Sequence, residues 1–179
     1  MSPGGETILR GSQSIYVYAT DNTRIMSFLL EYSDDGGTTW NPAGEDTSPR
    51  YNSSPKYWWD SFYFDTTQHP DGAYQIRATA VDMGGNTASM TRYYYFDNTE
   101  PSVPQGLTAT AGQREVALSW NAVEDTDFSH YRVYRSSDSG GPYSHLKSTS
   151  ETSHTNTGLV PDTAYYYVVT AVDLAGNES

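Results

Sequence analysis

The stretch Leu159–Asn177, LVPDTAYYYVVTAVDLAGN, decides the fold of the second half of this 179-residue chain. Every second residue in its middle falls on the same face of an extended strand. The residues of one face are Tyr165, Tyr167, Val169 and Ala171. The closing Asp173 and Gly-Asn pair are typical of a tight turn. A Tyr at such a corner can hydrogen-bond back to the nearby backbone, so the pattern predicts a corner, a central β-strand and a hairpin turn.

An echo of this stretch lies in the first half, at Asp71–Asn86, DGAYQIRATAVDMGGN. The two Ala-Val-Asp-x-x-Gly-Asn segments begin at Ala80 and Ala171, 91 residues apart. This spacing predicts two all-β domains of roughly 90–100 residues, the usual size of a β-sandwich. Pro101 and Pro104 mark a short, stiff joint between them. We therefore expect a first sandwich over residues 1–98, a linker over 99–104 and a second sandwich over 105–179.

The composition suits strands and turns, with 16 Tyr among 179 residues and no Cys. Residues 1–100 carry 13 acidic and six basic side chains, and the remainder carries nine and four. Because both halves are acidic, neither offers a basic face for nucleic acid or for an anionic membrane. No apolar run is long enough to span a bilayer, so we expect no membrane insertion.

The first half contains several alternating segments. In the segment that holds Ile15 and Val17, the sequence predicts apolar side chains inward, with Tyr16 and Tyr18 outward. Residues 25–33 predict the next strand. The Pro- and Ser-rich residues 41–56 predict a loop. Ser33–Trp40, SDDGGTTW, matches the Asp-box pattern of sialidase-type propellers. Only one copy is present, so we interpret it as a stabilised hairpin.

Residues 57–64, YWWDSFYF, form the most aromatic segment of the chain. Its aromatic rings could stack on sugar rings as a binding platform. Alternatively, alternate residues fill the core while the others cover the sheet, and this is the interpretation that we favour. Trp58 or Trp59 would carry a platform, because two adjacent strand residues cannot both point inward.

Residues 1–98 resemble the bacterial Ig-like domains that occur in tandem in secreted and cell-wall proteins. The resemblance rests on segments that include Ala19–Asn22, Ala80–Asp82 and Asp97–Thr99. Residues 101–179 resemble a fibronectin type III domain, through Trp120, Tyr131–Tyr134 and the Leu159–Tyr165 corner. The last strand of that fold is missing from the sequence, which predicts an open sheet edge, left by truncation or filled by another chain.

These resemblances imply a non-catalytic spacer or presenting module of a secreted or cell-surface bacterial protein, such as an adhesin or a polysaccharide-degrading enzyme. They imply an extracellular location, with other domains of the same parent protein as partners and with the signal peptide outside this chain. The alternative is a binding module for polysaccharide or a cell-surface protein, which would use exposed aromatic residues or the open sheet edge.

Enzymatic chemistry finds little support in the sequence. The four His residues fall in no metal-ligand spacing, and neither a G-x-S-x-G motif nor a phosphate-binding loop is present. We therefore expect neither catalysis nor a cofactor. Calcium at the joint between the domains is the chemical alternative, because several turns there carry oxygen ligands. The candidate ligands are Asp97, Glu100, Asp125, Asp127, Asp173 and Asn177. The simpler interpretation is that each Asp caps its own turn.

Overall fold

The computed structural model describes residues 7–179. The chain divides into two compact units between Asn98 and Thr99. Both units are built almost entirely of β-strands. The one helical segment among the described residues is a single 3₁₀ turn, η1 (Thr66–Gln68). No helix in this part of the chain is long and apolar enough to cross a membrane.

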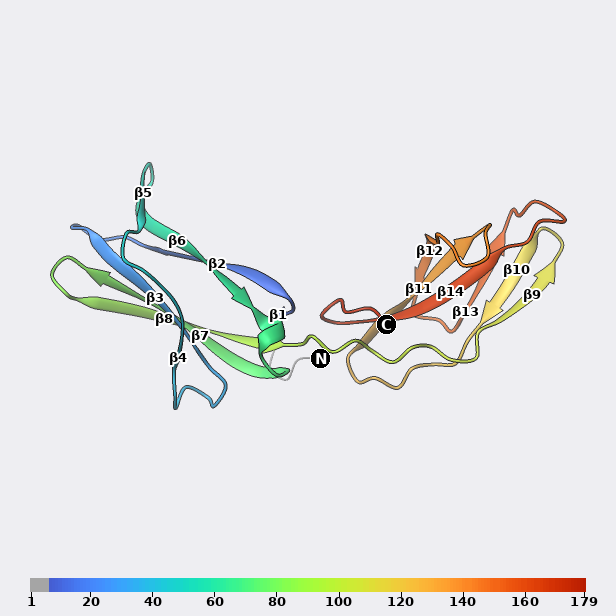
Figure 1. Cartoon of the computed structure of the whole chain (residues 1–179), viewed down its shortest axis with the longest axis horizontal. Helices are drawn as coiled ribbons and strands as arrows, with labels where there is room; N and C mark the ends of the chain where they lie inside the picture. Colours follow the sequence, from blue (N-terminus) through green and yellow to red (C-terminus); the bar gives the residue numbers. More distant parts are fainter. Residues whose placement is uncertain (1–6) are drawn as a thin grey trace. The chain divides into compact units, whose positions relative to one another are not determined.

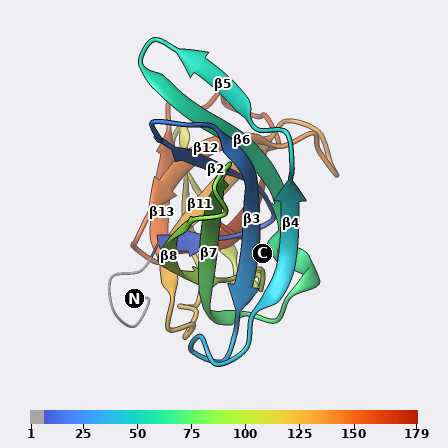
Figure 2. The ribbon, with the colours of Figure 1, turned by 90° about the vertical axis from the view of Figure 1, so that its left-hand side faces the viewer.

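The first domain is a sandwich of two sheets. The larger sheet has the order β1-β8-β7-β3-β4, and Figure 2 shows β8, β7, β3 and β4 side by side. Its strands are β1 (Thr7–Leu9), β8 (Thr87–Phe96), β7 (Gly72–Asp82), β3 (Ile25–Ser33) and β4 (Asn41–Asp46). The smaller sheet has the order β2-β6-β5. Its strands are β2 (Ser12–Ala19), β6 (Lys56–Asp65) and β5 (Arg50–Ser53). All pairs are antiparallel except β1 with β8.

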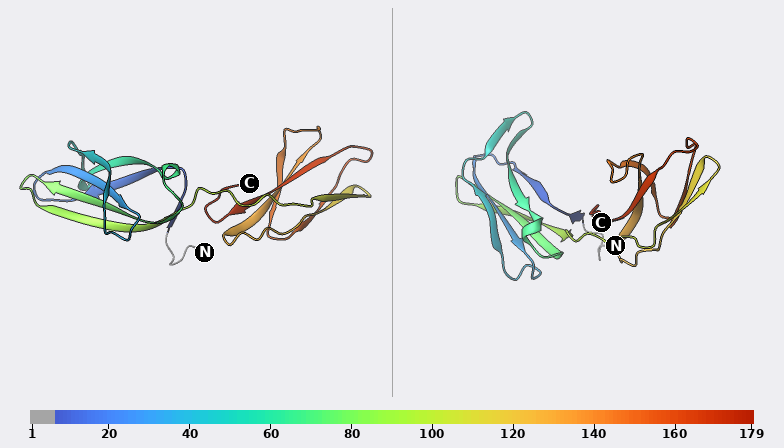
Figure 3. Two further views of the ribbon diagram at one scale, coloured as in Figure 1. Left: turned by 60° about the horizontal axis from the view of Figure 1, so that its bottom comes forward. Right: turned by 45° about the vertical axis from the view of Figure 1, so that its right-hand side comes forward.

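The second domain has two three-stranded sheets of orders β13-β10-β9 and β12-β11-β14. Figure 3 shows β9 and β10, in yellow, apart from β11 and β14, in orange to red. The first sheet contains β9 (Thr108–Gly112), β10 (Glu115–Ser119) and β13 (Ser153–Thr157). The second contains β11 (Phe128–Ser136), β12 (Ser144–Thr149) and β14 (Tyr166–Asp173).

Each domain has its own hydrophobic core, and the predicted alternation of side chains is confirmed. Buried residues of the first core are Val17, Ile25, Phe28, Leu30, Phe62, Phe64, Tyr74, Ile76 and Phe96. Those of the second are Leu118, Trp120, Tyr131, Val133, Val169 and Ala171. Because both cores lie between paired sheets, the face opposite each inward row is free to meet solvent.

A tyrosine locks the corner before the central strand of each domain. In the second domain, the Val160 N–H donates to the hydroxyl of Tyr165 at 3.3 Å. In the first domain, the hydroxyl of Tyr74 donates to the Pro70 carbonyl at 3.1 Å. Burial raises the pKa of Tyr74, which keeps the hydroxyl protonated as a donor. The predicted corner is thus present in both halves.

The prediction of a loop over residues 41–56 is wrong, because β4 and β5 lie within it. Both are edge strands, where Pro42 removes no ladder hydrogen bond that a neighbour needs. A bulge in β3–β4 pairing brings Gly44 opposite Leu30. A Cβ added at Gly44 would lie 2.5 Å from Cδ1 of Phe62. The Pro and Gly residues that suggest a loop therefore belong to a bulged edge strand that lies close to the opposite sheet.

The Asp-box segment forms the predicted stabilised hairpin turn. The carboxylate of Asp35 accepts hydrogen bonds from the backbone of Thr38 and Thr39, and Trp40 Nε1 donates to the Gly37 carbonyl at 3.0 Å. The side-chain hydrogen bond from Thr39 contributes most to holding the pKa of Asp35 far below its usual range.

Residues 178 and 179 pair with the edge of β14. Glu178 forms an isolated antiparallel β-bridge with Val172, and the Ser179 N–H donates to the Ala171 carbonyl at 3.1 Å. The Glu178 carboxylate also accepts from Thr170 and Tyr134 and pairs with Arg132. Burial raises the pKa of Glu178, but these hydrogen bonds outweigh burial and hold it below its usual value.

Candidate functional site

The two adjacent tryptophans of the aromatic segment lie on β6, and their side chains point to opposite faces of its sheet. Trp58 has the same parity as Phe62 and Phe64, and it packs against the core of the first domain. Trp59 has the parity of Tyr57 and Tyr63, so it lies on the outer face of sheet β2-β6-β5. The candidate platform therefore belongs to Trp59, and Trp58 is mainly a core residue.

Trp59 belongs to a row of aromatic side chains on this face, which we call the aromatic row and define as Tyr57, Trp59, Tyr18, Tyr16 and Tyr63. In the antiparallel pairing of β2 with β6, Tyr18 lies opposite Trp59, Tyr16 opposite Ser61 and Ser14 opposite Tyr63. The Tyr18 and Tyr57 rings meet edge to face, with centroids 6.3 Å apart. Tyr16, Tyr18 and Tyr63 are 68%, 77% and 68% exposed, whereas Tyr57 and Trp59 are half-buried, so the three tyrosines are the most exposed members of the row.

Strand β5 adds one charged side chain to this face. Arg50 lies opposite Trp59 in the pairing of β5 with β6, and its guanidinium sits 4.8 Å from the centroid of the Trp59 ring. The same guanidinium forms an ion pair with Asp60 at 3.1 Å. The cation thus holds the indole in place, and Asp60 balances its charge.

Beyond the sandwich, β5 and β6 continue as a projecting hairpin (Figures 1 and 2). A pocket of about 270 Å³ lies at this end of the domain. It is lined by Asp21, Asn22, Thr23, Tyr51, Lys56, Tyr57 and Trp58. Tyr57 belongs both to this pocket and to the aromatic row, so the row ends at a group of polar side chains.

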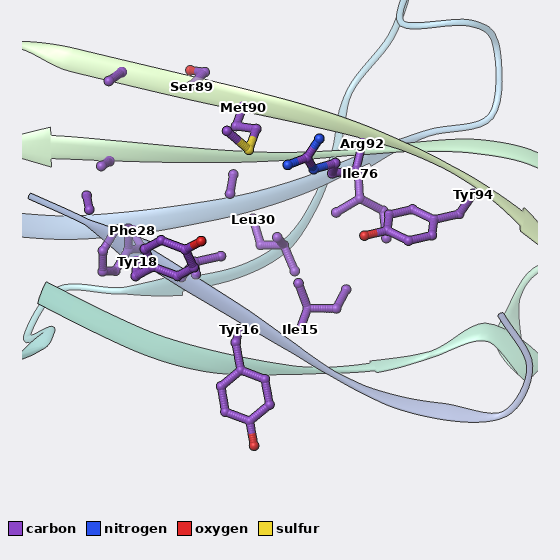
Figure 4. Close-up of a pocket in the computed structure, with 15 residues that line it drawn as sticks. Ile15, Tyr16, Tyr18, Phe28, Leu30, Ile76, Ser89, Met90, Arg92 and Tyr94 are labelled. Atoms are coloured by element: carbon purple, nitrogen blue, oxygen red, sulfur yellow. The ribbon is translucent and has the colours of Figure 1, made fainter. Parts of the chain in front are cut away.

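A second cavity of the first domain has a mostly apolar lining. It occupies about 390 Å³ between β2 and strands β3, β7 and β8, and Ile15, Leu30 and Ile76 help to line it. Figure 4 shows Ile15 pointing into this space, whereas Tyr16 points away from it. Its lining is mostly apolar core, and it offers no pair of side chains arranged as nucleophile and base.

Two of the predicted metal ligands of the second domain, Asp125 and Asp173, already accept hydrogen bonds from other residues. Asp125 accepts from the N–H and hydroxyl of Ser102, each at 3.1 Å. Asp173 accepts from the backbone of Gly176 and from both the backbone and the side chain of Asn177. Carboxylate oxygens of Asp127 and Asp173 lie within 4.8 Å of each other. Asp173 thus caps its own turn, whereas Asp125 binds Ser102, 23 residues earlier in the chain.

The remaining predicted ligands are Asp97 and Glu100. Asp97 follows β8 at the end of the first domain and is buried, whereas Glu100 is exposed at the start of the second unit. A calcium site that joins these two residues to the carboxylates of the second domain stays a prediction.

The sequence indicated that Tyr16 and Tyr18 point outward, but not that they lie beside Trp59. That neighbourhood depends on the register of β2 against β6, which connects residues 41 positions apart in the chain. A signal for choosing between the tryptophans was available, because Phe62 and Phe64 share the parity of Trp58.

Three comparisons place the chain among known proteins. The family model described as "Fibronectin type III domain" matches residues 102–179. The chain is 39% identical over 129 residues to exoglucanase B of Cellulomonas fimi, covering 65% of this chain and 11% of that protein. It is 42% identical over 85 residues to chitinase Chi52 of Paenibacillus xylanexedens, covering 46% and 15% of the two chains. The chain thus spans only a small part of these relatives.

Among solved structures, chicken CNTN1 FN1-FN3 domains superpose with a TM-score of 0.64 at 18% identity, covering 97% of this chain and 58% of that chain. At this identity the likeness concerns the fold alone. Together with the family match, it agrees with the two sandwiches described above. Residues 102–179 thus match the fibronectin type III family, and the first domain has the β-sandwich fold that Ig-like and fibronectin type III domains share.

Proposed function

We propose that these two domains are a non-catalytic spacer within a larger extracellular bacterial protein that degrades polysaccharide. The observation that carries the proposal is the small share, 11% and 15%, that the chain covers of an exoglucanase and of a chitinase. A module that accounts for so little of two enzymes with different substrates is better suited to positioning than to the reaction itself.

The structure of each domain supports this role. The corner tyrosines and the turn carboxylates use their polar atoms to fasten the backbone. Proteases cleave a folded chain where it opens locally. Dense strand pairing around a buried core opposes such opening. The proposed partners are therefore the other domains of the same parent protein, and the extracellular location is part of the same proposal.

Two measurements on the purified chain test the spacer role. Incubation with xylan, soluble starch and glycol chitin should release no reducing sugar above the buffer control. Trypsin should leave the folded chain intact, although the unfolded chain offers ten Lys and Arg residues for cleavage. Sugar release that increases with protein concentration would contradict the non-catalytic assignment, and rapid cleavage within either domain would contradict the role as a resistant spacer.

A further inference from the structure

The aromatic row places five rings on the outer face of sheet β2-β6-β5, and three of them, Tyr16, Tyr18 and Tyr63, are more than two-thirds exposed. Along β6, the positions of residues 57, 59, 61 and 63 face outward, and each carries an aromatic ring either on β6 or at the paired position of β2. Residues two apart on a strand are separated by about 7 Å, so the row is roughly 20 Å long.

We propose that this row binds a single chain of a neutral, soluble polysaccharide, with Trp59 and Tyr18 at the centre of the site. The C–H groups on one side of a pyranose ring pack favourably on the electron-rich face of an aromatic ring. Hydroxyl and amide groups that could hydrogen-bond to sugar hydroxyls line the same face: Ser14 and Ser61 lie within the row, and Asn52 lies opposite Tyr57.

Charge favours a neutral occupant. Arg50 is the cation against the central ring, and its ion pair with Asp60 balances it. The chain as a whole has a net charge of −12, which repels nucleic acid even though bases also stack on aromatic rings. The same charge opposes pairing of two copies of this chain.

The size of the row also argues against a protein partner. Two neighbouring strands over this length present roughly 200 Å². A stable protein interface buries about 800 Å² on each partner. An extended sugar chain, by contrast, needs contact only along a narrow row. The pocket beside Tyr57, with Asn22 and Lys56 in its lining, supplies polar groups where the row ends.

Ring orientation distinguishes a single chain from a crystalline surface. The planes of Tyr18 and Tyr57 meet at 66°, so the two rings cannot lie flat on one plane of an insoluble crystal. Strand twist increases this divergence along the row. A soluble chain can rotate about its glycosidic bonds and follow the rings. The choice of polysaccharide as ligand rests on the proposed function, whereas the geometry of the row does not.

Native affinity electrophoresis of the complete chain tests the site with xylan, soluble starch and hydroxyethyl cellulose as separate probes. We expect at least one of them to retard the protein. Trp59→Ala and Tyr18→Ala should each weaken that binding by about tenfold. Tyr93→Ala is the matched control, because Tyr93 is 58% exposed on β8 of the other sheet, and its binding should equal that of the unmodified chain.

Tyr16→Ala and Tyr63→Ala keep the test decisive if Trp59→Ala fails to fold, because both side chains are well exposed. No retardation by any of the three probes would overturn the site, as would equal binding by the row variants and by Tyr93→Ala. Preferential binding to crystalline cellulose would overturn the single-chain assignment. None of these results depends on the sugar-release and trypsin measurements, so the spacer role and the binding site can fail separately.

Discussion

Asn177 closes the turn after β14 by donating both its backbone N–H and its side-chain amide to the carboxylate of Asp173, each at 2.8 Å. Asn86 makes the same two bonds to Asp82 after β7, at 2.8 and 2.7 Å. In both turns the backbone N–H of the Asp also donates to the carbonyl of the Asn. The repeated Ala-Val-Asp-x-x-Gly-Asn segment is therefore a structural device that ends the central strand of each domain.

Burial should make the second of these turns the more sensitive to mutation. Asn177 is 6% exposed and Asp173 3%, whereas Asn86 is exposed. We expect Asn177→Ala to destabilise its domain by about 1–3 kcal/mol, because a buried carboxylate oxygen loses its donor. Asn86→Ala should cost less, because water can replace the amide. Thermal unfolding of both variants measures the difference, and equal effects would contradict it.

Loss of the corner hydroxyls should weaken each domain separately. Tyr74→Phe removes the hydrogen bond to the Pro70 carbonyl, and Tyr165→Phe removes the one from the Val160 N–H. Each change should cost about 0.5–1.5 kcal/mol, or several degrees in the melting temperature of a domain of this size. Tyr166→Phe serves as the control, because adjacent residues of an extended strand point to opposite faces, so Tyr166 points away from the side on which Tyr165 lies. A control as destabilised as Tyr165→Phe would argue against the corner.

Acid should remove the contribution of the turn carboxylates. The Asn86 side chain, followed by backbone N–H groups, lowers the pKa of Asp82. A carboxyl group whose pKa is lower in the folded state stabilises the fold above its unfolded pKa of about 4, and this contribution disappears as the pH falls further. The difference in melting temperature between the unmodified chain and Asp82→Asn should therefore shrink below pH 4. A difference that grows on acidification would reverse the sign of this linkage.

Gly44→Ala should destabilise the first domain by overpacking. The added methyl group would lie 2.5 Å from the ring of Phe62, which is 8% exposed in the core. Insertion of a methyl group into a filled core costs about 1–3 kcal/mol. Ser53→Ala, on the exposed neighbouring edge strand β5, should change stability by less than about 0.5 kcal/mol. Chemical denaturation of the two variants compares their free energies of unfolding. An unchanged stability of Gly44→Ala would contradict the prediction and would show that β4 can move away from Phe62.

Calcium should have little effect on the stability of the chain. Both carboxylate oxygens of Asp173 already accept hydrogen bonds within their own turn, and a cation would have to replace them. We expect the melting temperature to be the same with saturating calcium and with chelator. A ligand that binds only the folded state raises the melting temperature, so a rise of several degrees with calcium would support the sequence-based metal site instead.

The sequence predicted which face of a strand each side chain occupies more successfully than it predicted which strands pair and in what register. Alternation placed Tyr16 outward and Val17 inward, because period-2 patterning depends only on local sequence. The strands β4 and β5 were missed, because edge strands tolerate the Pro and Gly residues that otherwise signal loops. The alignment of Tyr18 with Trp59 depends on long-range register, and no local pattern records it.

The parallel pairing of β1 with β8 determines how the first domain responds to tension. Thr7 lies beside Tyr94 and Leu9 beside Phe96, so the two strands run in the same direction at the ends of the domain. When the chain is pulled from both sides, these strands slide along each other, and their hydrogen bonds are loaded together in shear instead of opening one at a time. A strand of only three residues thus acts as a shear clamp between the two ends of the first domain.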